Sequence, residues 1–196
     1  MIFDIGNVLE VNPRTRWAER WARRLQIDPP SFEQRLGEVW APGSIGASSL
    51  EEIERETAAT FGLDEVRLGE LMDDAWSEYV GTLNHELTDY FIRVRRRYRT
   101  GILSNSFVGA REREEKLYRF GEMCEVVVYS HEEGCLKPDP RIYRTVCARL
   151  DVAPEAAVFL DDVQENVDGA IAVGMQAIRF RDNAQAMTEL GALLSE

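Results

Sequence analysis

The chain has 196 residues, with 23 lysines and arginines against 35 aspartates and glutamates, and a formal net charge of −12. This length is enough for one well-buried α/β domain with a modest insertion. Because a surface this acidic repels nucleic acid and anionic lipid, we expect neither as a partner. No apolar run approaches the roughly 18 residues that span a bilayer. The basic segment Arg93–Arg99 is interpreted as a solvated helix face.

Cysteine usage and the N-terminus bear on the compartment. The three cysteines lack CxxC spacing, which indicates neither a disulfide framework nor a zinc site and favours a reducing compartment; they are Cys124, Cys135 and Cys147. No basic segment precedes an apolar one at Met1, which argues against a secretory signal. We therefore expect a cytoplasmic protein. Because the first strand begins at Met1 itself, we also expect the native chain to start a few residues earlier.

Five short apolar segments, bounded by glycine or polar residues, are typical of buried parallel strands. They are Ile2–Ile5, Gly101–Ser104, Glu125–Tyr129, Ala157–Asp161 and Gln176–Phe180. Helical patterns separate the last four, which predicts βαβ units and a parallel sheet. These helices are Arg111–Phe120, one opened by Asp139-Pro140, and Val163–Val173 with a cap at Gly174.

Residues 13–82 interrupt this α/β pattern with an all-helical block. Its apolar residues recur at helical spacing, for example at Trp17, Trp21 and Leu25. The segment Ser48–Glu51 resembles a capping box at a helix start. We interpret the block as an inserted helical subdomain, with residues 1–12 and 83–196 forming the core domain. Its tryptophan and methionine stripes are interpreted as packed core rather than as the lining of a pocket.

The informative polar residues lie at the carboxyl ends of the expected strands. Asp4 is in the first strand, Ser104 ends the second, Lys137 follows the third, and the pair Asp161-Asp162 ends the fourth. In open parallel sheets, ligands bind in the crevice outside the carboxyl ends of the strands. Each residue alone is weak evidence, but together they predict one site that these side chains share.

Four segments in the same order resemble the four motifs of the haloacid dehalogenase superfamily. They are Ile2–Leu9, Ile102–Asn105, Gly134–Tyr143 and Val158–Asn166. The helical block is similar to the small helical cap of one subclass. The resemblance implies a Rossmann-like parallel sheet flanked by helices. It also implies a Mg²⁺-dependent hydrolase of phosphoric monoesters whose substrate is a small phosphorylated metabolite. The start of the first motif resembles a branch that includes sugar-1-phosphate phosphatases, which points to a sugar phosphate.

The resemblance assigns the catalytic roles. Asp4 would be the nucleophile, because a carboxylate can attack phosphorus and form an aspartyl-phosphate. Lys137 would add a fixed positive charge beside the transferring phosphoryl group, and Ser104 a hydroxyl donor. Asn105 joins Ser104 and Lys137 as an expected phosphate-binding residue.

The same resemblance implies a Mg²⁺ site, since this hard cation prefers oxygen ligands. The expected ligands are the carboxylates of Asp4, Asp161 and Asp162 and the backbone carbonyl of Gly6. Without a cation, three carboxylates at one place would repel one another. Asn166 is expected to brace the acidic pair from behind.

Gly6 departs from the family pattern. The phosphatases of the family usually carry a second aspartate there, which acts as general acid and base, and losing such a group costs on the order of 10²–10⁴ in rate. Two interpretations remain open. Another group, such as Glu10, His131 or a cap residue, supplies the proton, or the leaving group needs little help, as in anomeric or acyl phosphates. His131 itself is interpreted as a solvated loop residue.

Two rival functions belong to other classes. A 2-haloacid dehalogenase would use Asp4, Ser104, Lys137 and Asn105 without Mg²⁺, but the unshielded acidic pair Asp161-Asp162 would repel its carboxylate substrate. A non-catalytic binding or regulatory protein would have kept the fold without the activity. Neither the substrate nor the oligomeric state follows from the sequence.

Overall fold

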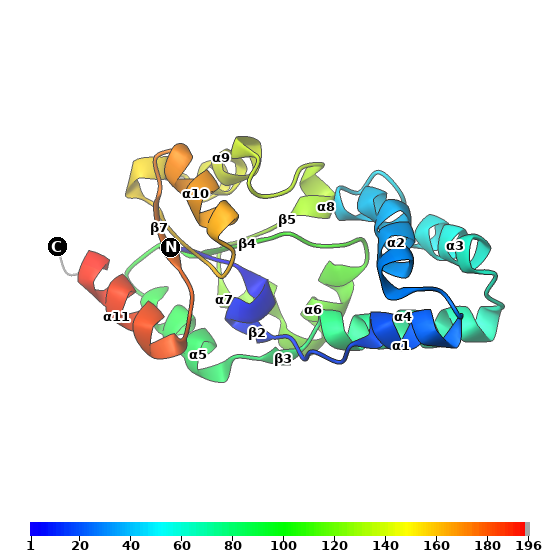
Figure 1. The fold of residues 1–196 in the computed structure, drawn as a ribbon. Coiled ribbons are helices and arrows are strands. Elements are labelled where there is room, and N and C mark those ends of the chain that lie inside the picture. The colour runs from blue at the N-terminus through cyan, green and yellow to red at the C-terminus, as the bar shows by residue number, and fades with distance from the viewer. Residues whose placement is uncertain (195–196) are drawn as a thin grey trace.

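The computed structural model describes residues 1–194. A five-stranded sheet with strand order β5-β4-β1-β6-β7 forms its centre, and every neighbouring pair is parallel (Figure 1). The strands are β1 (Ile2–Phe3), β4 (Gly101–Ser104), β5 (Val126–Tyr129), β6 (Val158–Asp161) and β7 (Gln176–Arg179). The five expected strands and the parallel sheet are confirmed, with ends that differ by at most two residues. Because the chain adds β4 and β5 on one side of β1 and β6 and β7 on the other, a crevice forms at the carboxyl end of β1.

Helices cover both faces of the sheet (Figure 1). One face carries α9 (Pro140–Arg149) and α10 (Gln164–Ala172). The other carries α5 (His85–Val94), α7 (Phe120–Met123) and α11 (Asn183–Leu194). No helix within residues 1–194 combines the length and hydropathy that crossing a membrane requires.

Alternate residues of each strand enter opposite core layers, because successive side chains of a strand point to opposite faces. Ile2, Leu103 and Phe159 pack in one buried cluster, and Phe3, Ile102 and Leu160 pack in the other. All six side chains are fully buried. Burial of a side chain of this size stabilises the fold by about 1.5–3 kcal/mol, so the two layers hold the strand ends firmly in place.

Shorter elements connect the strands: α6 (Ala110–Tyr118), α8 (Ser130–Glu133) and a short turn at Pro154–Ala156. The helix expected over 111–120 is therefore broken. Arg119 adopts φ +58°, a left-handed conformation that ends α6 before α7 begins. By contrast, the Asp139 cap and the positive φ at Gly174 are as expected.

Between Val11 and Thr82 the chain forms four helices, and they pack around a further apolar core that Phe107 and Ala110 also enter (Figure 1). They are α1 (Trp17–Arg24), α2 (Pro29–Ser44), α3 (Leu50–Phe61) and α4 (Glu65–Tyr79). The chain enters the insertion through β2 (Glu10–Val11) and leaves it through β3 (Thr82–Leu83), and these strands pair antiparallel. The short two-stranded sheet therefore joins the insertion to the part of the chain that holds the five-stranded sheet.

The capping box of α3 lies one residue later than expected. Ser49 accepts the N–H of Glu52, and Glu52 accepts the N–H of Ser49 at 2.8 Å. The expected frame, Ser48 with Glu51, was wrong because the sequence offers two overlapping Ser-x-x-Glu frames. Pattern alone does not distinguish between them.

Candidate active site

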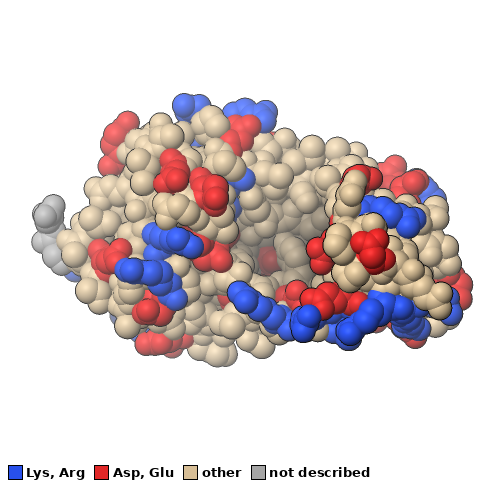
Figure 2. Space-filling view, viewed as in Figure 1, with Lys and Arg blue, Asp and Glu red and all other residues tan. Residues whose placement is uncertain are grey.

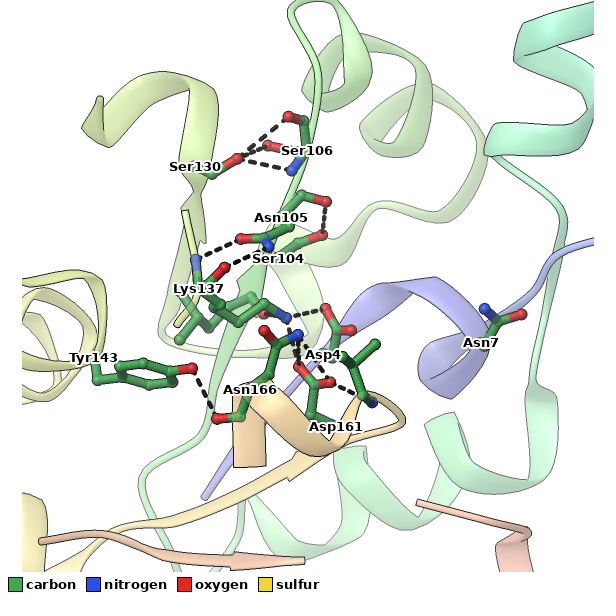
Figure 3. A network of polar contacts seen from close by, with 12 residues as sticks. Asp4, Asn7, Ser104, Asn105, Ser106, Ser130, Lys137, Tyr143, Asp161 and Asn166 are labelled. Atoms are coloured by element: carbon green, nitrogen blue, oxygen red, sulfur yellow. Dashed lines mark hydrogen bonds and ion pairs between the residues drawn. The ribbon is translucent and has the colours of Figure 1, made fainter. Parts of the chain in front are cut away.

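Asp4 lies where β1 ends. Its backbone N–H donates to Leu160 O at 2.9 Å, so the residue is still held beside β6. The chain then turns through Ile5–Leu9, and Asn7 adopts φ +53° in this turn. The turn ends the strand earlier than the sequence predicts and leaves the Asp4 carboxyl group at the carboxyl edge of the sheet (Figure 3).

Lys137 points its ammonium group at two carboxylates (Figure 3). Nζ lies 2.7 Å from Asp4 Oδ1 and 2.6 Å from Asp161 Oδ2, and it donates to Leu103 O at 3.1 Å. These three acceptors match the three protons of an ammonium group. Only 3% of the residue is exposed. The side chain is therefore fixed in place, with its charge next to Asp4.

Burial and neighbouring charges together shift the pKa values of Asp4 and Lys137. Burial raises the pKa of Asp4 to about 7, although Lys137 opposes the shift. Burial by itself would lower the pKa of Lys137, but the charges of Asp4 and Asp161 raise it above its ordinary value. Lys137 therefore keeps its charge.

The carboxylates of Asp4, Asp161 and Asp162 meet at one point. One ligand oxygen from each lies within 4.8 Å of the others. Burial and the charge of Asp161 raise the pKa of Asp162. In their ionised forms, three carboxylates and the single ammonium group of Lys137 leave two negative charges. A set of hard oxygen donors with this charge fits a divalent cation such as Mg²⁺.

The two acidic residues after β6 have different surroundings. Asp161 is fully buried and accepts bonds from Lys137 Nζ, from Val163 N at 2.8 Å and from Asn166 Nδ2 at 3.1 Å on each oxygen. These contacts use most of its lone pairs. Asp162 is only partly buried. The contact that we expected from Asn166 is present, and coordination of a metal by either aspartate stays a prediction.

Ser104 and Asn105 end β4 next to this cluster. Ser104 is buried, and its hydroxyl donates to Asn105 O at 3.3 Å. The Asn105 side chain donates to Lys137 O at 3.0 Å and accepts from Lys137 N at 2.7 Å. Asn105 therefore holds the backbone of Lys137, a role that the sequence did not predict. Its part in binding phosphate stays a prediction.

A buried pair of glutamates lies beside the site. Glu10 is 1% exposed, and its Oε1 has no hydrogen-bond partner among the described residues. It lines a cavity of about 300 Å³ together with Gly6, Ser104 and Glu114. Burial, helped by the charges of Glu114 and Asp4, raises the pKa of Glu10 to about 10. Glu10 therefore carries a proton at neutral pH.

Glu114, which sequence reasoning missed, is 1% exposed in α6 and accepts the hydroxyl of Tyr129. Burial raises the pKa of Glu114 to about 7, although the Tyr129 bond opposes this shift. No signal in the sequence separates it from the other charged residues around it, because all belong to one polar helix.

His131 is not a solvated loop residue, and that expectation was wrong. It lies in α8 and is partly buried, with Nδ1 2.7 Å from Ser106 Oγ. Burial lowers its pKa. His131 lines a different cavity, with Leu50 and Arg113, rather than the cavity of Glu10 and Gly6. This position makes it a poorer candidate than Glu10 for proton transfer.

Comparison with known protein families identifies the family to which this chain belongs. The chain matches the haloacid dehalogenase-like hydrolase family over residues 3–174. The chain belongs to this family. A haloacid dehalogenase (HAD) family enzyme from Bacteroides thetaiotaomicron, solved with magnesium and inorganic phosphate, has the same fold. Its TM-score is 0.81 at 20% identity, over 95% of this chain and 96% of that one.

Curated relatives of the chain include longer proteins. Acyl-CoA dehydrogenase family member 10 from Mus musculus is 38% identical over 48% of this chain. The chain spans only 9% to 50% of the first three curated relatives that it matches. A sesquiterpene phosphatase from Aspergillus oryzae is 28% identical, over 97% of this chain and 84% of that protein.

Gly6 is the position at which this family member departs from the common phosphatase pattern. Its backbone has φ −60° and ψ 128°, which any residue adopts. A Cβ at this position would have one near neighbour, Asn12 Oδ1, at an ordinary contact distance of 3.7 Å. Neither the backbone conformation nor the space at position 6 therefore requires glycine. The lack of a side chain affects the chemistry of the site instead.

The aromatic stripes of the inserted helices do more than fill a core. Trp21 is buried as expected, but Trp17, Trp40 and Trp76 line a cavity of about 460 Å³. Tyr79 lines both this cavity and the one that contains Gly6 and Glu10. The expectation that these stripes are only packed core was incomplete, because helical spacing does not show where neighbouring helices separate.

Proposed function

We propose that this HAD family member is a Mg²⁺-dependent phosphohydrolase that acts on a small phosphorylated metabolite through an aspartyl-phosphate on Asp4. The arrangement of Lys137 between Asp4 and Asp161, next to Asp162, carries the proposal. It places a nucleophilic carboxylate beside a fixed cation, in an oxygen-rich site whose net charge is −2 when all three carboxylates are ionised. A phosphatase among the relatives, and the magnesium and phosphate bound to the B. thetaiotaomicron enzyme, support it.

Residues of this chain would divide the work. Asp4 attacks phosphorus, and the ester oxygen leaves with the organic group; water then hydrolyses the aspartyl-phosphate. Lys137 and Ser104 stabilise the negative charge on the phosphoryl oxygens during transfer. Asp4, Asp161, Asp162 and the Gly6 carbonyl would hold Mg²⁺, which would neutralise charge between nucleophile and phosphate.

Glu10 is our candidate for the proton donor that Gly6 lacks. It lines the same cavity as Gly6 and Ser104, and its Oε1 is free of partners within the described part of the chain. A buried carboxylic acid that carries its proton at neutral pH can donate it to a departing oxygen. Of the two explanations that the sequence left open, we therefore favour a substitute donor over a leaving group that needs none.

We further propose that residues 13–82 form a cap next to the site, joined at β2 and β3 to a core of residues 1–12 and 83–196. Glu78 of α4 supports a close connection, since its backbone carbonyl accepts Asn12 Nδ2 of the core at 3.1 Å and the residue lines the Gly6 cavity. We place the protein in the cytoplasm, because its three cysteines are free.

Hydrolysis of a panel of phosphate monoesters, assayed with Mg²⁺ and with EDTA, tests the proposal. We expect release of phosphate that EDTA abolishes and Mg²⁺ restores. Asp162→Asn should lose it, while Asp151→Asn, at an exposed aspartate, should keep it. Turnover in EDTA together with chloride release from 2-chloroacids would support the dehalogenase instead. Complete inactivity towards both panels would support the non-catalytic rival.

A further inference from the structure

The cavity beside the phosphate site is walled by aromatic rings. Trp17 and Trp40 stack with ring centroids 5.7 Å apart, and Phe107 lies 5.3 Å from Trp40. Trp76 and Tyr79 form an edge-on pair at 5.3 Å. Figure 2 shows a hollow between the inserted helices and the part that holds the sheet, with an upper wall of uncharged residues and charged residues along its lower rim. The volume of about 460 Å³ lies within the range of roughly 300–1,000 Å³ that is typical of small-molecule sites.

This aromatic cavity adjoins the catalytic residues. Glu78, Tyr79 and Asn105 line both the aromatic cavity and the cavity that contains Gly6, Ser104 and Glu10. The organic part of a phosphate ester that is bound at Asp4 can therefore extend past Tyr79 into the aromatic cavity.

Most of the few polar side chains that line the aromatic cavity have partners in the protein; Trp76 Nε1 has none among the described residues. Glu78 accepts two bonds from Thr15, and Asn105 holds the Lys137 backbone. Ser106 Oγ contacts His131 Nδ1 at 2.7 Å. Within residues 1–194, no lysine or arginine lines this cavity. A ligand with many hydroxyl groups would find few free donors or acceptors here.

We propose that this cavity binds an apolar organic group, so that the substrate is a phosphate monoester of a hydrocarbon or aryl alcohol rather than of a sugar. The inference rests on the proposed phosphatase function. A hydroxyl buried without a partner weakens binding by about 5- to 150-fold, whereas each buried methylene strengthens it by about fourfold. Because few free polar groups lie beside it, this lining of tryptophan, phenylalanine and methionine favours an apolar group over a sugar.

The identity of the organic group also determines whether the departing oxygen needs a proton from an acid. Simple alcohols are poor leaving groups, and their departure requires an acid. Glu10 lines the cavity that contains Gly6 and Ser104, next to which the ester oxygen of a substrate bound at Asp4 would lie. An apolar alkyl ester and a protonated Glu10 are therefore consistent with each other.

A second, polar cavity offers the alternative. It is lined by Arg14, Asp162, Arg179 and Arg181, and Glu78 lines it as well. A charged or polyhydroxyl group would bind there instead. If Arg14→Ala weakens substrate binding, the organic group lies in the polar cavity. If binding is unchanged, the organic group lies in the aromatic cavity.

The test measures binding and turnover over a series of chain lengths. Alkylphosphonates from ethyl to decyl, which cannot be hydrolysed, are titrated by calorimetry with Mg²⁺ present. The matching alkyl phosphates and a set of sugar phosphates are compared by kcat/KM. We expect affinity and kcat/KM to rise about two- to fourfold per methylene until the cavity is full, and Arg14→Ala to leave this slope unchanged.

Gly37→Leu makes the test specific to the cavity. Gly37 in α2 lines it, and a Cβ there meets no atom within 4 Å. The matched control is Gly69→Leu in α4, which has the same open surroundings and does not line the cavity. Both substitutions favour a helix over glycine, so both proteins should fold. Gly37→Leu should abolish the gain for long chains and leave ethyl phosphate unaffected, whereas Gly69→Leu should behave like the parent.

The outcomes test the apolar cavity and the phosphatase function separately. A flat chain-length series, a preference for sugar phosphates, or an equal effect of both leucine variants would overturn the inference and leave the phosphatase function intact. Phosphonate binding that strengthens with chain length, without turnover of any ester, would support the apolar cavity and contradict the phosphatase function.

Discussion

Lys137 Nζ lies 2.7 Å from Asp4 Oδ1, and both side chains are almost completely buried. The pair brings together a charge from the loop after β5 and a carboxyl group at the end of β1. Because Asn105 holds the Lys137 backbone at two points, the ammonium group approaches Asp4 in a fixed direction. In our account this contact neutralises the nucleophile before the phosphate dianion arrives.

Lys137→Met should therefore remove activity and stability together. We expect kcat/KM to fall by about 10²–10³, and the free energy of unfolding to fall by about 3–5 kcal/mol because two buried carboxylates lose their partner. Lys116→Met, at an exposed position of α6, should change neither by a measurable amount. Steady-state kinetics and urea unfolding give the two values. A fully active Lys137→Met protein would contradict the role assigned to this pair.

Glu10→Gln should affect esters according to their leaving groups. Glutamine keeps the size of the side chain but cannot donate the acid proton. We expect kcat/KM to fall by about 10²–10⁴ for alkyl phosphates and to change little for aryl phosphates, which leave without help. The measurement is kcat/KM over a series of leaving-group pKa values. A uniform loss across the series would show that Glu10 is only structural.

Gly6→Asp should restore the general acid that is common in the family. The φ of −60° and the open surroundings allow the side chain without strain. We expect this substitution to recover most of the alkyl phosphate activity that Glu10→Gln loses, so the double variant is the informative protein. If a correctly folded double variant stays as slow as Glu10→Gln, position 6 does not exchange protons with the leaving group.

The pH dependence of stability reports on Glu114. Its pKa rises from 4.5 to about 7 on folding, mainly through burial. The contribution of Glu114 to the free energy of unfolding is therefore fully present below pH 4.5 and is lost as the pH rises through about 7. The folded state must then give up a proton that it binds more tightly than the unfolded state does.

Glu114→Gln has no proton to lose, so its stability relative to the parent should improve between pH 5 and pH 8. The expected change is on the order of 3 kcal/mol. Urea unfolding in EDTA measures it, with Glu112→Gln as the exposed control on the same helix. Parallel pH profiles for the parent and Glu114→Gln would refute the proposed titration.

Much of the fold follows from local sequence signals. The five strands are continuous apolar segments with clear boundaries, and parallel strands bring Asp4, Ser104 and Asp161 to one edge. Smaller errors arose where sequence patterns were degenerate, as in the two overlapping capping frames before Ile53. The break at Arg119 has no such signal, because a left-handed arginine depends on the packing around it.

The site was harder to predict where tertiary contacts decide a residue's role. Asn105 holds Lys137 through bonds that exist only when two distant loops meet. Trp17 and Trp21 are one helical turn apart, but Trp17 lines the cavity and Trp21 lies in the core. Whether a tryptophan lines the cavity or lies in the core depends on where α1, α2 and α4 separate. Spacing along one helix does not contain that information.

The most direct test of the central claim is to trap the covalent intermediate. The protein is mixed with a good substrate and Mg²⁺, quenched in acid within the first turnover, and analysed by peptide mass spectrometry. We predict the added mass of one phosphoryl group on the peptide that contains Asp4, which disappears in Asp4→Asn and in samples prepared with EDTA. Rapid phosphate release from an enzyme whose Asp4 peptide stays unmodified in every quenched sample would contradict the account.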